Sequence, residues 1–180
     1  MEPLRLFDNE SKLEFGTGLR NRLRVVHGSS PLLARLPELE PRSEPLGALA
    51  VEAGLVTPVD LAWALQEATA RRRRLGEILL GAEFVTREDL TRLLGEQRGI
   101  SYVDLRDVEP DPDAARLLPA STARLFRAVA LGFSRGFPVV AVADPTDELA
   151  LARVRSFVEG ARFVASSDAE IARRLDDLDS

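Results

Sequence analysis

The chain has 180 residues, of which 45% are hydrophobic and 29% charged, and its formal net charge is −5. This acidic balance argues against a general nucleic-acid binder, because such proteins usually carry a basic surface. There is no cysteine, and the single histidine is His27, which excludes disulfides, thiolate metal sites and a histidine metal cluster. The single lysine, Lys12, stands in no Gly-x-x-x-x-Gly-Lys-Ser/Thr loop, which excludes a conventional P-loop ATPase.

Residues 1–44 are predicted to be an irregular N-terminal segment and linker, because prolines punctuate SSPLLARLPELEPRSEP. LRNRLRVV (19–26) is the one short strand expected there. The acidic start MEPLRLFDNE is no signal peptide, and the longest apolar runs, such as AVALGF, are far shorter than a membrane span. We therefore expect a soluble cytoplasmic protein that inserts no segment directly into a membrane.

Residues 45–98 contain an internal repeat. LGALAVEAGLVTPVDLAWAL (46–65) aligns without gaps with LGEILLGAEFVTREDLTRLL (75–94), and eight of the 20 aligned pairs are identical. Apolar residues recur at helical spacing in both copies, and Thr57 and Thr86 stand at N-cap positions with an aspartate three residues later. The repeat predicts four helices arranged as two copies of a helix hairpin.

Residues 99–180 alternate strand and helix patterns. Strands are predicted over 101–105, 127–133, 138–144 and 162–166, with a hairpin turn at 134–136. Helices are predicted over 111–119, 120–126, 148–160 and from Ser167 to about Leu178. The predicted fold class is α+β: a tandem helix-hairpin subdomain at 45–98, then a small α/β subdomain at 99–180 with helices on one face of a sheet of three to four strands.

Together these features resemble the N-terminal domain of type II secretion and type IV pilus assembly ATPases, the GspE N-terminal or MshEN family. The resemblance covers roughly residues 45–178 and is carried by LGEILLGAEFVTREDLTRLLGEQRG (75–99), SYVDL (101–105) and VVAVADP (139–145). It implies two 24-residue motifs separated by five residues, each running from Arg-Leu-Gly through spaced leucines to a glutamine. In many members this pair binds cyclic di-GMP without metal or chemistry. The resemblance also implies protein partners in a secretion, pilus or motility machinery, and recruitment to the inner membrane by such a partner.

The second copy carries the complete motif. Arg74, Leu75 and Gly76 open it, Gln97 is residue 24 counted from Arg74, and the leucine positions hold Leu90 and Leu94. The resemblance implies that Arg74 and Gln97 contact the nucleotide and that Leu75 and Gly76 lie against it. These residue types suit that role, since a guanidinium matches a guanine edge or a phosphate and a glutamine amide both donates and accepts.

The first copy departs from this pattern. Leu46 and Gly47 remain as candidate ligand-binding residues, but Pro45 replaces the arginine and Ala68 the glutamine. We therefore expect a non-enzymatic interaction or regulatory module of a type II secretion or type IV pilus-like system, with a partly degenerate nucleotide site and no cofactor. The alternative is a cyclic di-GMP receptor that uses the intact second motif, completed by Arg42 or by a second protomer.

Two conspicuous features have simpler interpretations. The run Arg71 to Arg74 is read as a solvated helix end at its first three residues, with Arg74 alone opening the motif, rather than as a nucleic-acid site. Trp63 is interpreted as a packing residue between helices.

Overall fold

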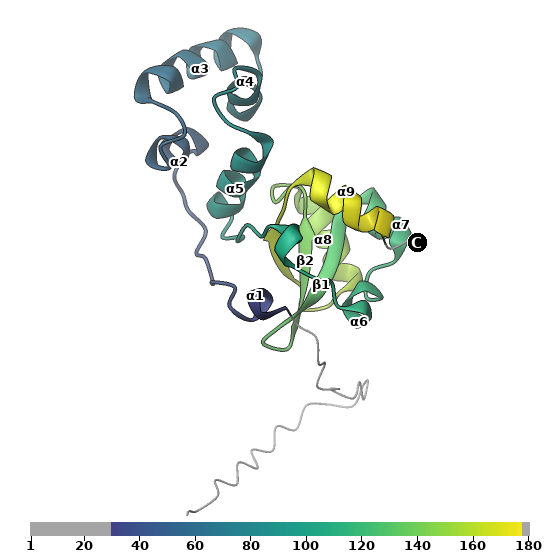
Figure 1. Ribbon diagram of the computed structural model, residues 1–180. Coiled ribbons are helices and arrows are strands. Elements are labelled where there is room, and N and C mark those ends of the chain that lie inside the picture. Colours follow the sequence, from purple (N-terminus) through teal and green to yellow (C-terminus); the bar gives the residue numbers. More distant parts are fainter. Residues whose placement is uncertain (1–29, 178–180) are drawn as a thin grey trace, which may run out of the picture.

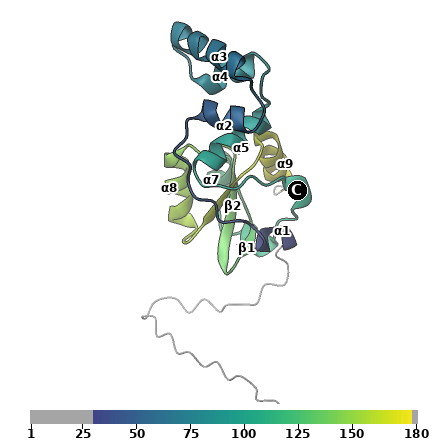
Figure 2. The same ribbon diagram turned by 90° about the vertical axis from the view of Figure 1, so that its left-hand side faces the viewer.

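The structure, a computed structural model, describes residues 30–177 (Figure 1). The strand predicted at 19–26 lies outside the described residues. Within them, a helical half lies at one end of the molecule and a half built on a β-sheet at the other, and both views show this separation (Figures 1 and 2). None of the described helices is long and apolar enough to cross a membrane.

The helical half contains the four predicted helices, namely α2 (Leu46–Glu52), α3 (Pro58–Arg71), α4 (Leu75–Gly81) and α5 (Arg87–Gln97). Thr57 and Thr86 cap α3 and α5, each accepting a 3.1 Å hydrogen bond from the backbone N–H three residues later. The capping box is complete only in the second copy, where the Thr86 N–H also donates to Asp89 at 3.0 Å. The local signals in the sequence therefore start both long helices.

The core of the helical half repeats the symmetry of the sequence. Its eight buried residues form four pairs, and the members of each pair are 29 residues apart: Leu49 and Ile78, Ala50 and Leu79, Val56 and Val85, and Ala64 and Leu93. Burial of equivalent side chains from both copies is the main source of stability for such a pair of hairpins, because neither copy has a large apolar face of its own.

The sheet half has three strands in the order β1 (Ala128–Ser134), β2 (Phe137–Val142), β3 (Arg162–Ala165). β1 and β2 form the predicted antiparallel hairpin, and β3 runs parallel to β2 after the crossover helix α8 (Glu148–Phe157). The chain closes with α9 (Asp168–Asp177). This is the α+β architecture predicted from the sequence, with three strands in the sheet.

Helices cover both faces of the sheet, so the expectation of helices on one face was wrong. α8 and α9 lie on opposite sides of the strands in both views (Figures 1 and 2). The four residues 139–142 of β2 are each at most 1% exposed, although successive side chains of a strand point to opposite faces. The uninterrupted apolar run VVAV in the sequence is typical of a strand that is buried on both faces.

The prediction of a strand at 101–105 was also wrong. Only Tyr102 pairs with the sheet, through a single parallel bridge to Ala165. The Asp104 carboxylate accepts a 2.9 Å hydrogen bond from the Arg106 N–H and starts the short 3₁₀ helix Leu105–Asp107. The Leu105 N–H donates to Glu170 at 3.2 Å. These carboxylates therefore accept hydrogen bonds from backbone N–H groups that would otherwise be free to extend the pairing with β3.

Two short helices precede the sheet in the chain, and their bounds differ from those predicted. α6 (Pro112–Ala115) is shorter than the predicted 111–119, whereas α7 (Ala120–Leu125) matches 120–126 closely. α8 ends at Phe157 rather than at 160, and Gly160 adopts a φ of +70° in the turn that follows.

Part of the segment expected to be an irregular linker packs on the sheet. The short helix α1 (Pro31–Ala34) places Leu33, which is fully buried, against Gly132 of β1, and Leu36 is buried in the same core. The chain then runs through residues 37–45 to the helical half. This segment therefore contacts both halves and lies beside the start of the first motif.

Candidate functional site

The two motifs begin with the same backbone geometry. Pro45 is the N-cap of α2 with φ −60° and ψ 147°, and Arg74 is the N-cap of α4 with φ −70° and ψ 144°. The side chain of Arg74 is exposed and forms no hydrogen bond or ion pair with any residue from 30 to 177. The proline therefore stands in the place of the arginine without altering the chain path, and position 45 lacks both the guanidinium and a backbone N–H.

The leucines and glycines of the two motif starts interlock. A Cβ at Gly47 would lie 2.6 Å from a methyl of Leu61 and 3.3 Å from one of Leu75. A Cβ at Gly76 would lie 3.2 Å from a methyl of Leu90 and 3.7 Å from one of Leu46. The leucine of each motif thus approaches the glycine of the other, and both glycines are buried by leucine side chains.

Gln97, the last residue of the second motif, holds the segment that leads into the first. Its side-chain Nε2 donates a 2.9 Å hydrogen bond to the backbone carbonyl of Glu44. The N–H of Arg42 donates to the carbonyl of Gln97 at 3.1 Å. Gln97 forms no hydrogen bond with Arg74, so the two expected nucleotide contacts are not joined to each other.

Arg42 lies at the centre of three carboxylates. Its guanidinium lies 2.8 Å from Glu52, 2.8 Å from Glu96 and 3.4 Å from Glu44. The hydrogen bonds to Glu52, then to Glu96 and Glu44, raise the pKa of Arg42 above its ordinary value, and Arg42 in turn lowers the pKa of Glu44. This network joins α2, α5 and the connecting segment, and it leaves the surroundings of Gln97 with more negative than positive charge.

The structure brings together only some of the residues predicted for the site. Leu46, Gly47, Leu75 and Gly76 meet at the centre of the helical half with Leu90, while Leu94 is half-buried on α5. Arg74 stands apart from them at the surface. The glutamate network around Arg42 was not predicted, because nothing in the sequence signals that residues 42, 52 and 96 are close.

Arg71 to Arg73 and Trp63 take the structural roles expected of them. Arg71 pairs with Glu67 at 2.6 Å, and Arg73 pairs with Glu77 at 2.7 Å, each one helical turn away. Arg72 terminates α3 in the left-handed conformation. Trp63 packs edge-to-face on Phe84, with ring centroids 5.7 Å apart. Among residues 30–177 no group of three acidic or histidine side chains could hold a metal ion.

Comparison with known proteins relates the chain to assembly ATPases. A model of the MshEN domain matches residues 98–180. The type IV pilus assembly ATPase PilB of Thermus thermophilus is 35% identical over 95 residues, which are 51% of this chain and 11% of that protein. PilB of Myxococcus xanthus is 27% identical over 106 residues, which are 59% of this chain and 19% of that protein. The chain thus spans between a tenth and a fifth of the length of these relatives.

Solved structures cover a larger share of both chains. A structure of MshE with cdg, cyclic di-GMP, is 31% identical with a TM-score of 0.64, and the match covers 74% of this chain and 98% of that one. A structure of the N-terminal domain of XpsE has a TM-score of 0.51 at 21% identity and covers 78% of this chain and 97% of that one, which shows a shared fold. The chain belongs to the MshEN domain family and is homologous to the N-terminal region of the pilus and secretion ATPases.

Proposed function

We propose that this chain is a non-enzymatic interaction or regulatory module of a type IV pilus or type II secretion-like system, in which the cyclic di-GMP site is partly degenerate. The helical subdomain, residues 45–98, would carry the remnant of that site, and residues 99–180 would form the accompanying α/β subdomain. The main support for the proposal is that the side-chain amide of Gln97, an expected nucleotide contact, already donates a hydrogen bond to the carbonyl of Glu44.

The loss of polar anchors from the first motif supports this proposal. Pro45 offers no donor where the second motif has Arg74, and Ala68 offers none where it has Gln97. A bidentate contact to a base edge contributes roughly 1–3 kcal/mol. Since every 1.4 kcal/mol changes affinity tenfold, the loss of such a contact weakens binding by about one to two orders of magnitude.

The charges around Gln97 also disfavour an anionic ligand. Cyclic di-GMP carries two phosphate charges, while Glu44, Glu52 and Glu96 surround the single Arg42 beside Gln97. Like charges repel, and Arg42 is already neutralised by its carboxylate partners. A nucleotide that used Gln97 would have to break its bond to Glu44 and approach this acidic group.

A second candidate function, a cyclic di-GMP receptor, has its own support. The guanidinium of Arg74 is exposed and has no partner among the described residues, so it remains available to a phosphate or a guanine. The likeness to MshE with cyclic di-GMP favours the same function. In this case the intact motif would bind alone, or with a second protomer.

We infer that a protein component of a secretion, pilus or motility machinery is the partner, and that it recruits this cytoplasmic module to the inner membrane. Homology to pilus assembly ATPases supports this assignment. The acidic net charge disfavours nucleic acid as a partner. A pull-down with the full chain that recovers no such component would count against this partner class.

Isothermal titration with cyclic di-GMP separates the two functions. We expect no binding heat up to high micromolar ligand. Arg74→Ala tests the receptor alternative, and Arg73→Ala is the matched control, because Arg73 lies just before the motif and its guanidinium is already paired with Glu77. Submicromolar binding that is lost in Arg74→Ala and kept in Arg73→Ala would overturn the degenerate-site proposal and establish the receptor.

A further inference from the structure

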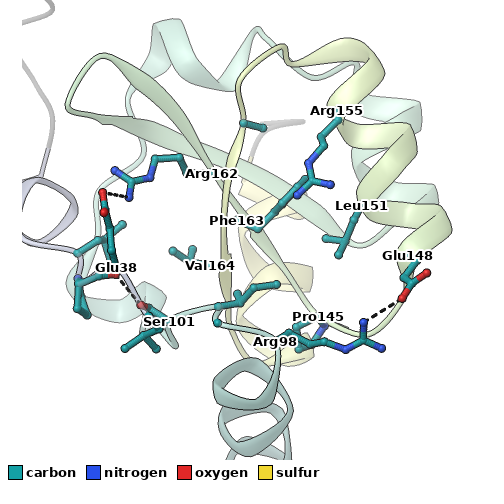
Figure 3. A pocket seen from close by; sticks show the side chains of 16 residues that line it. Glu38, Arg98, Ser101, Pro145, Glu148, Leu151, Arg155, Arg162, Phe163 and Val164 are labelled. Atoms are coloured by element: carbon teal, nitrogen blue, oxygen red, sulfur yellow. Dashed lines mark hydrogen bonds and ion pairs between the residues drawn. The ribbon is translucent and has the colours of Figure 1, made fainter. Parts of the chain in front are cut away.

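A groove lies along the outer edge of β3, away from the nucleotide motif. It is a cavity of about 650 Å³ lined on one side by residues 36–39 and on the other by α8, with residues 98–101 at one end (Figure 3). Phe163 and Val164 of β3 lie between these two walls in the close-up. No predicted nucleotide-binding residue lines this groove.

The groove occupies the position of a fourth strand that stops early. Next to β3, the Ala165 N–H donates to Ser101 and its carbonyl accepts from the Val103 N–H, both at 2.8 Å. Continuing this register would place Ile100 opposite Phe163. In that register the Gly99 carbonyl and the Ser101 N–H would pair with Phe163, but among the described residues neither does. The chain instead turns away at Gly99, which has a φ of +69°, and the Ile100 N–H donates to the Gly95 carbonyl at 2.8 Å.

The backbone of Phe163 is therefore an open edge. Hydrogen-bonding groups alternate sides along a parallel strand, so the N–H and C=O of Phe163 point the same way as those of Ala165, away from β2. Within residues 30–177 neither group has a hydrogen-bond partner outside the sheet. An exposed strand edge with a free donor and a free acceptor is a template for an added strand.

The groove is positively charged in a chain of net charge −5. Arg135 and Arg162 share a single carboxylate, Glu38, at 2.9 and 2.8 Å. The guanidinium of Arg155 lies 4.9 Å from the centre of the Phe163 ring and has no carboxylate partner among the described residues. Arg98 pairs with Glu148 at 2.9 Å. Among the residues that line the groove, three arginines (Arg98, Arg155 and Arg162) face two carboxylates, Glu38 and Glu148.

We propose that this groove binds an extended acidic segment of a partner protein, which adds to β3 as a fourth strand beside Arg162 and Phe163. Phe163 supplies backbone hydrogen bonds, the arginines attract acidic side chains, and the apolar lining accepts side chains on the alternate positions: Leu36, Leu39, Leu151 and Val164. The inference rests on the proposed interaction role and names the chemistry of the partner.

A defined peptide tests the proposal on the full chain. The probe is a fluorescein-labelled octapeptide of alternating Glu and Val, followed by fluorescence anisotropy and by amide chemical shifts in NMR spectra. We expect saturable binding with the largest shifts at Phe163 and its neighbours, and no binding of the Lys-Val counterpart. Absence of binding at millimolar Glu-Val peptide, or shifts confined to another surface, would overturn the proposal.

Matched variants locate the contact. Arg155→Glu reverses a charge in the groove and should weaken binding at least tenfold, while Arg153→Glu makes the same change on α8 outside the groove and should leave affinity unchanged. Circular dichroism checks that both variants fold. Equal effects of the two substitutions would show general electrostatic attraction and overturn the groove as the site.

A third arm tests strand addition itself. A Glu-Val peptide that is N-methylated at alternate amides keeps its charge but cannot pair as a strand, so we expect it to lose binding. Equal binding of this peptide, or full competition by citrate, would replace strand addition with a simple anion site.

Failure of this inference is distinguishable from failure of the proposed function. Tight binding of cyclic di-GMP overturns the degenerate site without affecting peptide binding. If the chain captures a pilus or secretion component but binds no acidic peptide, the interaction role stands and the groove proposal falls.

Discussion

The side-chain amide of Gln97 donates a 2.9 Å hydrogen bond to the backbone carbonyl of Glu44. The residue that closes the second motif therefore holds the residue just before Pro45, where the first motif begins. In a chain with two complete motifs, an arginine would follow Glu44 directly. Gln97 here stabilises the connection between α5 and α2.

We predict that Gln97→Ala costs about 1 kcal/mol of unfolding free energy, the usual net contribution of one hydrogen bond. Amide hydrogen exchange should become faster in residues 42–47, which Gln97 holds. Gln66→Ala is the control, because Gln66 is exposed on α3. Unchanged exchange at 42–47 would show that the bond contributes nothing to the order of this segment.

The junction of α5 and β3 should tolerate no side chain at Gly95. A Cβ at this position would lie 2.6 Å from the Ile100 carbonyl oxygen and 3.3 Å from the Cβ of Ala165. Because the closest atom belongs to the backbone, we expect Gly95→Ala to lower the unfolding free energy by roughly 1–3 kcal/mol in urea denaturation.

Gly81→Ala is the matched control for Gly95→Ala. It also lies in a helix, but a Cβ there would have no neighbour within 4 Å. Its alanine variant should be neutral or more stable by up to about 1 kcal/mol, owing to the higher helix propensity of alanine. Similar losses at both positions would contradict the close approach at Gly95.

The two copies differ in how they end their first helix, and this offers a stabilising substitution. Gly54 has φ +70° and its counterpart Glu83 has φ +58°, both left-handed. Only glycine adopts this region without strain, so Glu83→Gly should raise the unfolding free energy by about 1 kcal/mol. The reverse substitution, Gly54→Glu, should lower it. Thermal denaturation of both variants measures these effects, and a loss of stability in Glu83→Gly would contradict the assigned conformation.

The capping box at Thr86 should respond to acid. The hydrogen bond from Thr86 lowers the pKa of Asp89 below its ordinary value. Because the folded-state pKa is the lower one, the stabilisation by Asp89 is fully present above about pH 4 and is lost as the pH falls through the folded-state pKa. The difference in unfolding free energy between the wild type and Asp89→Asn should therefore shrink below pH 4. A difference that stays constant from pH 6 to pH 2.5 would contradict this assignment.

Local signals predicted most of the fold. The repeat predicted the four helices, and threonine caps with a following aspartate fixed the starts of α3 and α5. The hairpin of β1 and β2 followed from two apolar runs around 134–136. Predictions failed where side chains compete with the backbone, as Asp104 does at the end of the expected first strand.

Contacts between residues distant in sequence account for the rest. The three glutamates around Arg42 come from three separate segments, and no periodicity relates them. The groove beside β3 begins where the chain turns away from the strand at Gly99, which has a φ of +69° just after α5, and this depends on where α5 ends relative to the sheet. Motif residues could be named from the sequence, but the partners of Gln97 and Arg74 could not.

Restoring the first motif tests the central claim most directly. Pro45 and Arg74 share almost the same backbone angles, so the chain path at position 45 accommodates an arginine. Isothermal titration with cyclic di-GMP should be run on the wild type and on the double variant Pro45→Arg, Ala68→Gln. We predict no heat for the wild type and micromolar or tighter binding for the double variant. Tight binding by the wild type, or a double variant as inert as the wild type, would contradict the account.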